Sequence, residues 1–239
     1  MPDTPTQIVL PSNLASRLKP LQGKPPGSLV VHEIYRSLQG ESTFAGLPCV
    51  FVRLTACHLR CGYCDTVHAF GRGETLALQE VVTRALAPGD PLVEVTGGEP
   101  LLQPEVYPLM TRLADAGRTV LLETSGAVDI GNVDPRVHVI LDLKTPGSGE
   151  VSANIWANIE RLRHKDEVKF VICDRDDFDW SVAQVLARDL TGRCAVLFSP
   201  VFGRVNPTEL ATWVLESRLP VRFQVQLHKV LWEPNARGV

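Results

Sequence analysis

Apolar residues along the chain gather in short runs separated by polar, glycine-rich or proline-rich segments. Eight of these runs are rich in Val, Ile and Leu and show little alternation. That pattern is typical of strands that are buried on both faces of a parallel sheet. The predicted strands span residues 29–35, 48–54, 91–96, 119–124, 138–144, 167–172, 194–199 and 221–227.

Between these runs, apolar residues recur every three or four positions, as on the buried face of a helix. In residues 104–117, Val106, Leu109, Met110 and Leu113 share one such face. The same spacing predicts three further helices: one capped by Ser152 that buries Ile155, Ile159 and Leu162, one with Val182, Val185 and Leu186 on a face, and one over residues 207–217.

Strand and helix patterns alternate from residue 29 onward, which indicates an α/β fold of repeated β–α units. The alternation is compatible with a barrel or with a doubly wound sheet, and both gather active-site residues at the carboxyl ends of their strands. One site at one rim is therefore expected. Polar residues at the predicted strand ends are Arg53, Thr96, residues 123–125, Asp142, Lys144, Ser199 and residues 226–228.

Residues 1–28 differ from the rest, because they hold six of the 18 prolines and little periodicity. We predict a flexible N-terminal lead segment over 1–28 and a single domain over 29–239.

Composition and charge exclude several classes of protein. The 239 residues carry a formal net charge of -3 and a pI near 6.1, which does not indicate a nucleic-acid-binding surface. No apolar run approaches the roughly 18 residues that cross a bilayer, and no secretory signal opens the chain. A cytoplasmic location is expected, where cysteines stay reduced and clusters of them indicate metal or catalytic sites.

Cys57, Cys61 and Cys64 lie within eight residues, in the segment TACHLRCGYCDT. With His68 they could form a closed, tetrahedral zinc site of the Cys₃His type. The same thiolates could instead hold three irons of a 4Fe–4S cluster and leave the fourth iron open for a ligand. The remaining cysteines stand singly in apolar runs and are predicted to be buried small hydrophobes: Cys49, Cys173 and Cys194.

The segment TGGEP, residues 96–100, follows a predicted strand one β–α unit after the cysteines. Its two glycines allow the backbone to approach a ligand closely, and the Glu99 carboxylate could hold an ammonium group. Such a partner segment favours the iron–sulfur interpretation.

The CxxxCxxC spacing, with Tyr63 before the last cysteine and a GGEP segment after it, resembles the radical S-adenosylmethionine enzymes. The resemblance implies a partial (β/α) barrel, a 4Fe–4S cluster on the three cysteines, and S-adenosylmethionine chelated by the open iron. In that family the reduced cluster cleaves S-adenosylmethionine to a 5′-deoxyadenosyl radical.

Further segments are similar to the 7-carboxy-7-deazaguanine synthase family within that superfamily: EIYRSLQGES, FVRLTACHLRCGYCDT, TGGEPLLQ, ETSG, DLKTP, KFVI and QVQLHK. This resemblance implies a lyase that converts 6-carboxy-5,6,7,8-tetrahydropterin to 7-carboxy-7-deazaguanine with release of ammonia, in 7-deazapurine and queuosine biosynthesis. It also implies a Mg²⁺ ion, an electron donor such as flavodoxin or ferredoxin, and a homodimer.

The resemblance also assigns roles to matching positions. Arg53 would bind the substrate carboxylate through its planar guanidinium, although the residue alone fits a structural ion pair equally well. Thr66 would ligate Mg²⁺, although alone it indicates only a turn. Ser125 stands where many relatives have Asn. Implied substrate contacts are Leu38, Gln39, Gly40, Arg53, Thr96 and His228. Implied S-adenosylmethionine contacts are Tyr63, Cys64, Asp65, Gly98, Glu99, Ser125, Asp142, Lys144 and Ser199.

Two other interpretations stay open at this point. A glycyl-radical-enzyme activase of the same superfamily would share the cysteines and the GGEP segment but would need neither Arg53 nor Thr66. A zinc-stabilised binding module would perform no catalysis at all.

Overall fold

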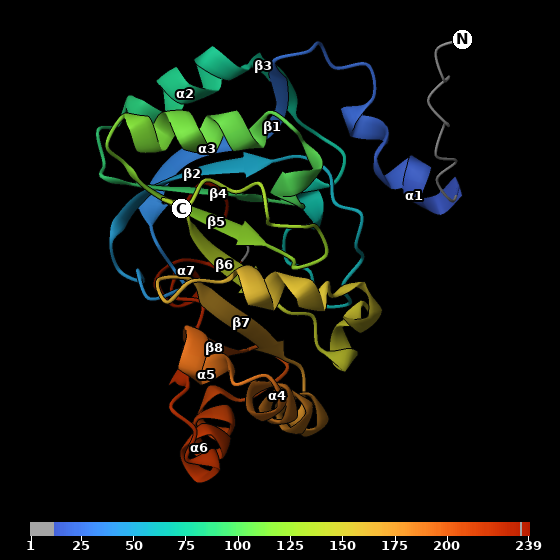
Figure 1. Ribbon diagram of the computed structural model, residues 1–239, viewed down its shortest axis with the longest axis vertical. Coiled ribbons are helices and arrows are strands. Elements are labelled where there is room, and N and C mark those ends of the chain that lie inside the picture. The colour runs from blue at the N-terminus through green and yellow to red at the C-terminus, as the bar shows by residue number, and fades with distance from the viewer. Residues whose placement is uncertain (1–11, 235) are drawn as a thin grey trace.

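The computed structural model describes residues 12–234 and 236–239, and this part of the chain folds around one nine-stranded sheet (Figure 1). The strand order is β3-β1-β2-β4-β5-β6-β7-β8-β9. β1 runs antiparallel to β2 and β3, whereas every neighbouring pair from β2 to β9 is parallel. The strands are β1 Ser28–Leu38, β2 Pro48–Leu54, β3 Glu74–Ala77, β4 Leu92–Gly97, β5 Thr119–Thr124, β6 His138–Asp142, β7 Glu167–Ile172, β8 Ala195–Pro200 and β9 Arg222–Phe223.

The sheet does not close on itself, because β3 and β9 stand at its two ends and do not pair with one another. Parallel strands, most of them joined by α-helices or 3₁₀ turns, make up its larger part, which is the arrangement of a partial (β/α) barrel. The predicted α/β class and barrel type are confirmed.

Helices flank the strands that they connect (Figure 1). α2 and α3 lie beside the first half of the sheet, and α4, α5 and α6 lie beside β7, β8 and β9. Within residues 12–234 and 236–239, no helix is both long and apolar enough to span a bilayer. The α-helices are α1 Ser12–Arg17, α2 Leu78–Leu86, α3 Val106–Asp115, α4 Arg175–Ala187, α5 Leu190–Arg193, α6 Pro207–Ser217 and α7 His228–Leu231. The 3₁₀ turns are Lys19–Leu21, Val67–Ala69, Pro100–Leu102, Pro146–Ser148, Val151–Ala153 and Trp156–Arg161.

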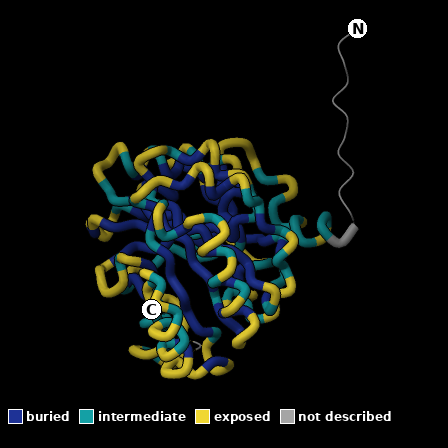
Figure 2. The backbone as a smooth tube through the Cα atoms, turned by 60° about the horizontal axis from the view of Figure 1, so that its bottom comes forward, coloured by how far each residue is buried: buried dark blue, intermediate teal, exposed yellow. Residues whose placement is uncertain are grey.

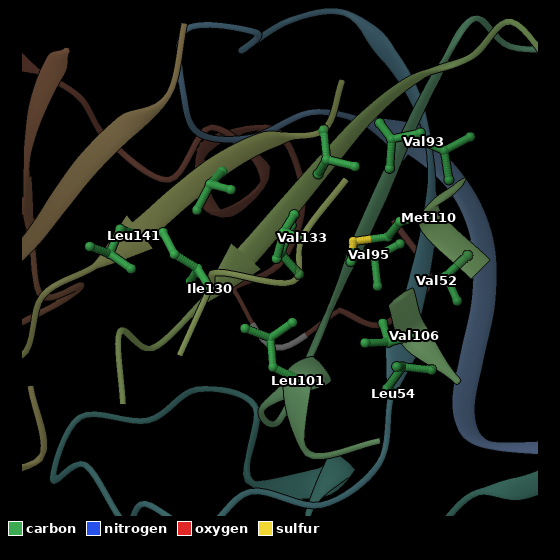
Figure 3. Packing of buried hydrophobic residues seen from close by; sticks show 14 of the residues in the cluster. Val52, Leu54, Val93, Val95, Leu101, Val106, Met110, Ile130, Val133 and Leu141 are labelled. Atoms are coloured by element: carbon green, nitrogen blue, oxygen red, sulfur yellow. The ribbon is translucent and has the colours of Figure 1, made fainter. Parts of the chain in front are cut away.

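The hydrophobic core is formed by residues of the strands and of these helices, and the buried residues gather in the interior of the molecule (Figure 2). Val52 and Val95, from the neighbouring strands β2 and β4, lie near Val106 and Met110 of α3 (Figure 3). Fully burying such a side chain stabilises the fold by about 1.5–3 kcal/mol. The predicted face of α3 is confirmed, and so is the burial of Cys49, Cys173 and Cys194.

The helix predicted after Ser152 is wrong, because this stretch forms two short 3₁₀ turns, Val151–Ala153 and Trp156–Arg161. Two asparagine side chains give the backbone other partners. Asn154 bonds to both backbone groups of Lys144, and Asn158 bonds to backbone groups of three residues in the loop after β5. Such side-chain to backbone bonds compete with α-helix.

Two further predictions differ from the structure. The strand predicted over 221–227 is only β9, because the chain then leaves the sheet, and the Leu227 amide donates to the Gly40 carbonyl at 2.9 Å. Leu186 is 64% exposed, so it does not belong to the buried face of α4. That face holds the predicted Val185 together with Asp177, Phe178 and Ser181. β3 and α2 were not predicted.

The described part of the predicted lead segment contains α1 and the 3₁₀ turn Lys19–Leu21, and residues 1–11 lie outside the described chain. Arg17 Nη1 donates to the carbonyl of His58 at 2.6 Å. This bond joins the N-terminal segment to the loop that carries the three clustered cysteines. The division into 1–28 and 29–239 stays a prediction.

Candidate active site

A cavity of about 730 Å³ opens at the carboxyl ends of the parallel strands. This volume falls within the usual range of ligand pockets. Of the residues predicted to form the site, all but Glu99 and Ser199 line the cavity. Ser199 is buried in β8.

The cysteine loop forms part of the cavity wall, and hydrogen bonds hold its backbone in place. The Gly62 amide donates to the Ser148 carbonyl at 2.9 Å, and the Arg60 amide donates to the Glu150 carboxylate at 2.6 Å. The Leu59 amide donates to Cys57 Sγ at 3.4 Å. Bonds of this kind hold the loop in place before any metal binds.

The placement of the three thiols and His68 bears on the zinc interpretation. In tetrahedral zinc sites with Zn–S bonds of about 2.3 Å, neighbouring sulfurs lie about 3.8 Å apart. Within the described chain, the Sγ atoms of Cys57, Cys61 and Cys64 do not form a group whose members all lie within 4.8 Å of one another. His68 instead lies near His32 and Glu33. In the described chain, the three thiols and His68 are therefore not arranged as a closed Cys₃His zinc site.

Burial makes these thiols poor acids. It raises the pKa of the Cys57 thiol to about 12, and it also raises the pKa of Cys61 and of Cys64, although the Lys144 ammonium opposes the shift at each of the three. Thiolates form here only where a metal replaces the proton.

The Gly-Gly turn after β4 packs directly on the start of the cysteine loop. Gly97 has φ 137°, and a side chain there would meet the backbone of Leu54 at 2.2 Å. At Gly98 a Cβ would lie 2.1 Å from the Ala56 carbonyl oxygen. Because neither position tolerates a side chain, the turn exposes bare backbone to the cavity.

Glu99 is fully buried beneath this turn, with its carboxylate bonded to protein groups. One oxygen accepts from the Thr124 hydroxyl at 2.9 Å, and the other accepts from the Ser125 amide at 2.8 Å. The carboxylate thus fixes the end of β5 against the turn. It does not line the cavity, so only the backbone of the GGE segment is left to face a ligand.

Thr66 and Asp65 lie at the opposite end of the cysteine loop. The Thr66 hydroxyl donates to Asp65 Oδ1 at 2.9 Å, which leaves the oxygen lone pairs of Thr66 available to a cation. Asp65 Oδ2 accepts from Lys229 Nζ at 2.7 Å and from Gln226 Nε2 at 3.1 Å. Burial alone would raise the pKa of Asp65, but the Lys229 ammonium and these hydrogen bonds lower it below its usual value.

Arg53 forms an ion pair and also lines the cavity. Its Nε donates to Glu33 Oε1 at 2.8 Å, and its Nη2 donates to the Tyr35 hydroxyl at 2.7 Å. The half-buried guanidinium also lines the cavity, so the ion pair holds it in a fixed orientation at the wall.

Gly40 and His228 meet on another wall. A side chain at Gly40 would lie 2.5 Å from His228 Nδ1, so only glycine lets the segment after β1 pack on this imidazole. Burial lowers the pKa of His228, and the cationic groups of Lys229 and Arg53 act in the same direction.

Sequence analysis missed a buried charge network on the cavity floor. Lys169 Nζ contacts the carboxylates of Glu41 at 2.9 Å and Asp142 at 3.8 Å, and it also pairs with Glu123. Glu94 accepts a bond from the Gln39 side-chain amide. The available signal was a single charge inside an apolar strand, as in LVEVT and EVKFVI.

Ionisation in this network is strongly shifted. Burial raises the pKa of Glu94 to about 8, and the negative charges of Glu123 and Glu41 add to the shift. Burial alone would lower the pKa of Lys169, but the three surrounding carboxylates keep it well above its usual value.

The C-terminal tail forms the remaining wall, for which no role was predicted. Pro234 and residues 236–239 line the cavity together with β-strand residues more than a hundred positions earlier. In Figure 1 the C-terminus accordingly lies over the middle of the sheet.

Comparison with known proteins gives a consistent picture. Residues 52–145 match the Radical SAM superfamily. The chain is 46% identical over 214 residues to the 7-carboxy-7-deazaguanine synthase of Chlorobaculum tepidum, across 88% of this chain and 97% of the relative. It is 44% identical over 225 residues to that of Koribacter versatilis, across 87% and 99%. The crystal structure of QueE from Escherichia coli aligns with a TM-score of 0.68 at 23% identity, over 84% of this chain and 95% of that one, which supports the fold alone.

Proposed function

The chain belongs to the 7-carboxy-7-deazaguanine synthase family of the radical S-adenosylmethionine superfamily, and we propose from this membership how its cavity performs the reaction. The protein is a lyase that converts 6-carboxy-5,6,7,8-tetrahydropterin to 7-carboxy-7-deazaguanine with release of ammonia. The observation that carries the proposal is a single cavity lined by the three clustered cysteines, the Gly98 backbone, Arg53 and Thr66.

Cys57, Cys61 and Cys64 fit a 4Fe–4S cluster, since their three soft thiols line one cavity and thiolates are the ligands that such clusters take. When bound, the cluster and S-adenosylmethionine supply the radical that starts the reaction. The exposed backbone at Gly98 would hold the amino group of S-adenosylmethionine. Tyr63, Asp65, Ser125, Asp142 and Lys144 would contact it from the same rim.

Arg53 would bind the substrate carboxylate. Two of its nitrogens are held by Glu33 and Tyr35, which fixes the plane of the guanidinium before the substrate arrives. A preoriented fork loses less conformational entropy on binding than a mobile side chain does.

Thr66 would ligate Mg²⁺ together with that carboxylate. Its hydroxyl donates to Asp65 and so presents lone pairs to a cation, and hard oxygen ligands suit Mg²⁺. The ion would neutralise the carboxylate and restrict its orientation.

The ring of the substrate would lie against Leu38, Gln39 and Gly40 on one side, with Thr96 and His228 on others. The Gln39 amide is bonded to Glu94, so its orientation is fixed as well. Glu99 and Ser199 keep a structural role in this proposal, because neither lines the cavity.

A glycyl-radical-enzyme activase would need an open face on which a partner protein could place its backbone. Here residues 236–239 line the cavity, which supports a small-molecule substrate instead.

We also propose an electron donor such as flavodoxin or ferredoxin, a homodimer and a cytoplasmic location. A donor would be needed because radical chemistry of this superfamily starts from the reduced cluster. Light scattering of the purified protein would measure the oligomeric state.

Anaerobic incubation of the reduced holoenzyme with 6-carboxytetrahydropterin, S-adenosylmethionine and Mg²⁺ tests the function. Mass spectrometry should detect 7-carboxy-7-deazaguanine, with ammonia in equal amount. A holoenzyme that binds S-adenosylmethionine and has an intact cluster, yet forms no product, would exclude the proposal.

A further inference from the structure

We propose that His32, Glu33 and His68 form a second metal site, on the wall of the cavity that the cysteines and Thr66 also line, that binds a divalent transition-metal cation such as Zn²⁺. Each residue offers one ligand atom, and these atoms all lie within 4.8 Å of one another. All three side chains are half-buried. The proposed site does not depend on the proposed reaction.

A β-bulge brings the first two ligands to the same side of the sheet. Val31 pairs with Leu54, and Glu33 pairs with Arg53, which is the neighbour of Leu54 in β2. His32 is therefore the extra residue of the bulge. In a regular strand, neighbouring side chains point to opposite faces. A bulge re-aims a side chain, and here it places His32 and Glu33 together.

A hydrogen bond to the backbone fixes the tautomer of the His32 imidazole. Its Nδ1 lies 2.7 Å from the Arg72 carbonyl oxygen, and since a carbonyl can only accept, Nδ1 carries the proton. The lone pair is therefore on Nε2. A metal-bound histidine usually makes this kind of bond with its other nitrogen.

The Arg72 carbonyl is itself fixed. It also accepts from the Thr55 hydroxyl at 2.9 Å. A side chain at the next residue, Gly73, would meet that hydroxyl at 2.2 Å and the Val31 carbonyl at 2.8 Å. Gly73 thus allows this loop to lie close to β1, where the Arg72 carbonyl can bond to His32.

The third ligand, His68, comes from the 3₁₀ turn Val67–Ala69. Its ring centroid lies 5.0 Å from that of His32, with the planes tilted by 57°. Glu33 completes the set. One of its oxygens accepts from Arg53, and a carboxylate has a second oxygen with lone pairs available.

Two imidazoles and one carboxylate suit Zn²⁺, Fe²⁺ and similar ions better than Mg²⁺. Such a set leaves a coordination position for water or another ligand. The ion would join β1 to the segment that follows the cysteine loop. Because it would bind the folded chain only, its binding should stabilise the protein.

Zinc binding to the anaerobically reconstituted holoenzyme tests the proposal. The wild-type protein should retain one equivalent of zinc after dialysis, with its iron content unchanged, and Zn²⁺ should raise its melting temperature more than equal Mg²⁺ does. His32→Gln and His68→Gln should each weaken zinc binding by at least about tenfold. His164→Gln, which changes an exposed histidine elsewhere, serves as the matched control.

X-ray absorption at the zinc edge of the wild-type protein gives a readout that does not depend on the variants folding. It should show two imidazole ligands and no sulfur. A sulfur-ligated zinc, or equal zinc retention by the wild type and by both histidine variants, would overturn the proposal.

Discussion

Lys229 of α7 and Asp65 of the cysteine loop form an ion pair, with 2.7 Å between Nζ and Oδ2. The two residues are separated by 164 positions in the chain. The pair fastens the start of the C-terminal tail to the residue that follows the last clustered cysteine. The tail then continues along the cavity wall.

Replacing Lys229 by Gln should loosen this tail. The Asp65 side chain is 45% exposed, so the pair contributes only up to about 1 kcal/mol, or about fivefold in affinity. We expect KM for the pterin to rise by two- to fivefold, and limited proteolysis to cleave the tail sooner. Lys165→Gln, at a distant ion pair, is the control. Identical cleavage rates in the two variants would show that the pair does not hold the tail.

The clustered and the single cysteines should respond differently to substitution. Cys57→Ala, Cys61→Ala and Cys64→Ala should each lose the iron–sulfur cluster. Cys49→Ala, Cys173→Ala and Cys194→Ala should keep it, because those three residues are buried and, in the described chain, are not among the residues that line the cavity. Iron analysis after anaerobic reconstitution measures this, with circular dichroism as the folding control. Loss of the cluster from folded Cys173→Ala contradicts the assignment.

Arg53→Lys should slow turnover while cluster content and S-adenosylmethionine binding survive. Lysine keeps the charge but loses the planar fork. A hydrogen bond to a charged group contributes about 1.5–3 kcal/mol, so kcat/KM should fall by roughly 10- to 150-fold. Arg36→Lys, which changes an exposed pair with Asp90, should leave kinetics unchanged. Equal kinetics for Arg53→Lys and wild type would place the substrate carboxylate elsewhere.

Thr66→Val should abolish the response of turnover to Mg²⁺, since valine has the same shape but no oxygen. Cluster content should stay at the wild-type level. The matched control is Thr212→Val, because that hydroxyl only bonds to the carbonyl of Thr208 in α6. If the Thr66 variant is still stimulated by Mg²⁺, or if chelation leaves wild-type turnover unchanged, then Thr66 does not bind the ion.

Glu94 should make stability depend on pH. Its pKa in the folded protein is about 8, above its ordinary value of 4.5, so the folded chain holds this proton where the unfolded chain releases it. The contribution of Glu94 to stability therefore falls as pH rises from about 4.5 and is fully lost above about 8.

Glu94→Gln should remove this loss and keep an acceptor for Gln39. The difference in melting temperature between the variant and the wild type should be measured at pH 6 and at pH 8.5. It should favour the variant more at pH 8.5, by at least about 2 °C. Exposed Glu80→Gln should show no such difference. A difference that does not change with pH would mean that Glu94 is ionised across this range.

Local patterns in the sequence were enough to determine several features of this protein. The continuous apolar runs predicted seven strands that extend close to their observed bounds. The cysteine loop, the Gly-Gly turn and the polar strand ends were also found, because each is carried by residues a few positions apart. Their meeting in one cavity followed from the rule that parallel strands share a carboxyl edge.

Only the tertiary structure decided the features that depend on distant partners. The segment that contains Asn154 and Asn158 has a helical pattern but forms 3₁₀ turns. The reason is that these two side chains bond to backbone groups of other loops. Lys169 is buried as an ion because three other elements supply carboxylates.

Side-chain direction was decided in the same way. Glu99, predicted to face a ligand, instead bonds to residues of the next strand. The bulge at His32 reverses the alternation that sequence alone would assign to β1. The periodicity of a sequence indicates which residues share a face of an element. Which way a polar side chain points depends on the hydrogen-bond and ion-pair partners that the folded chain brings near it.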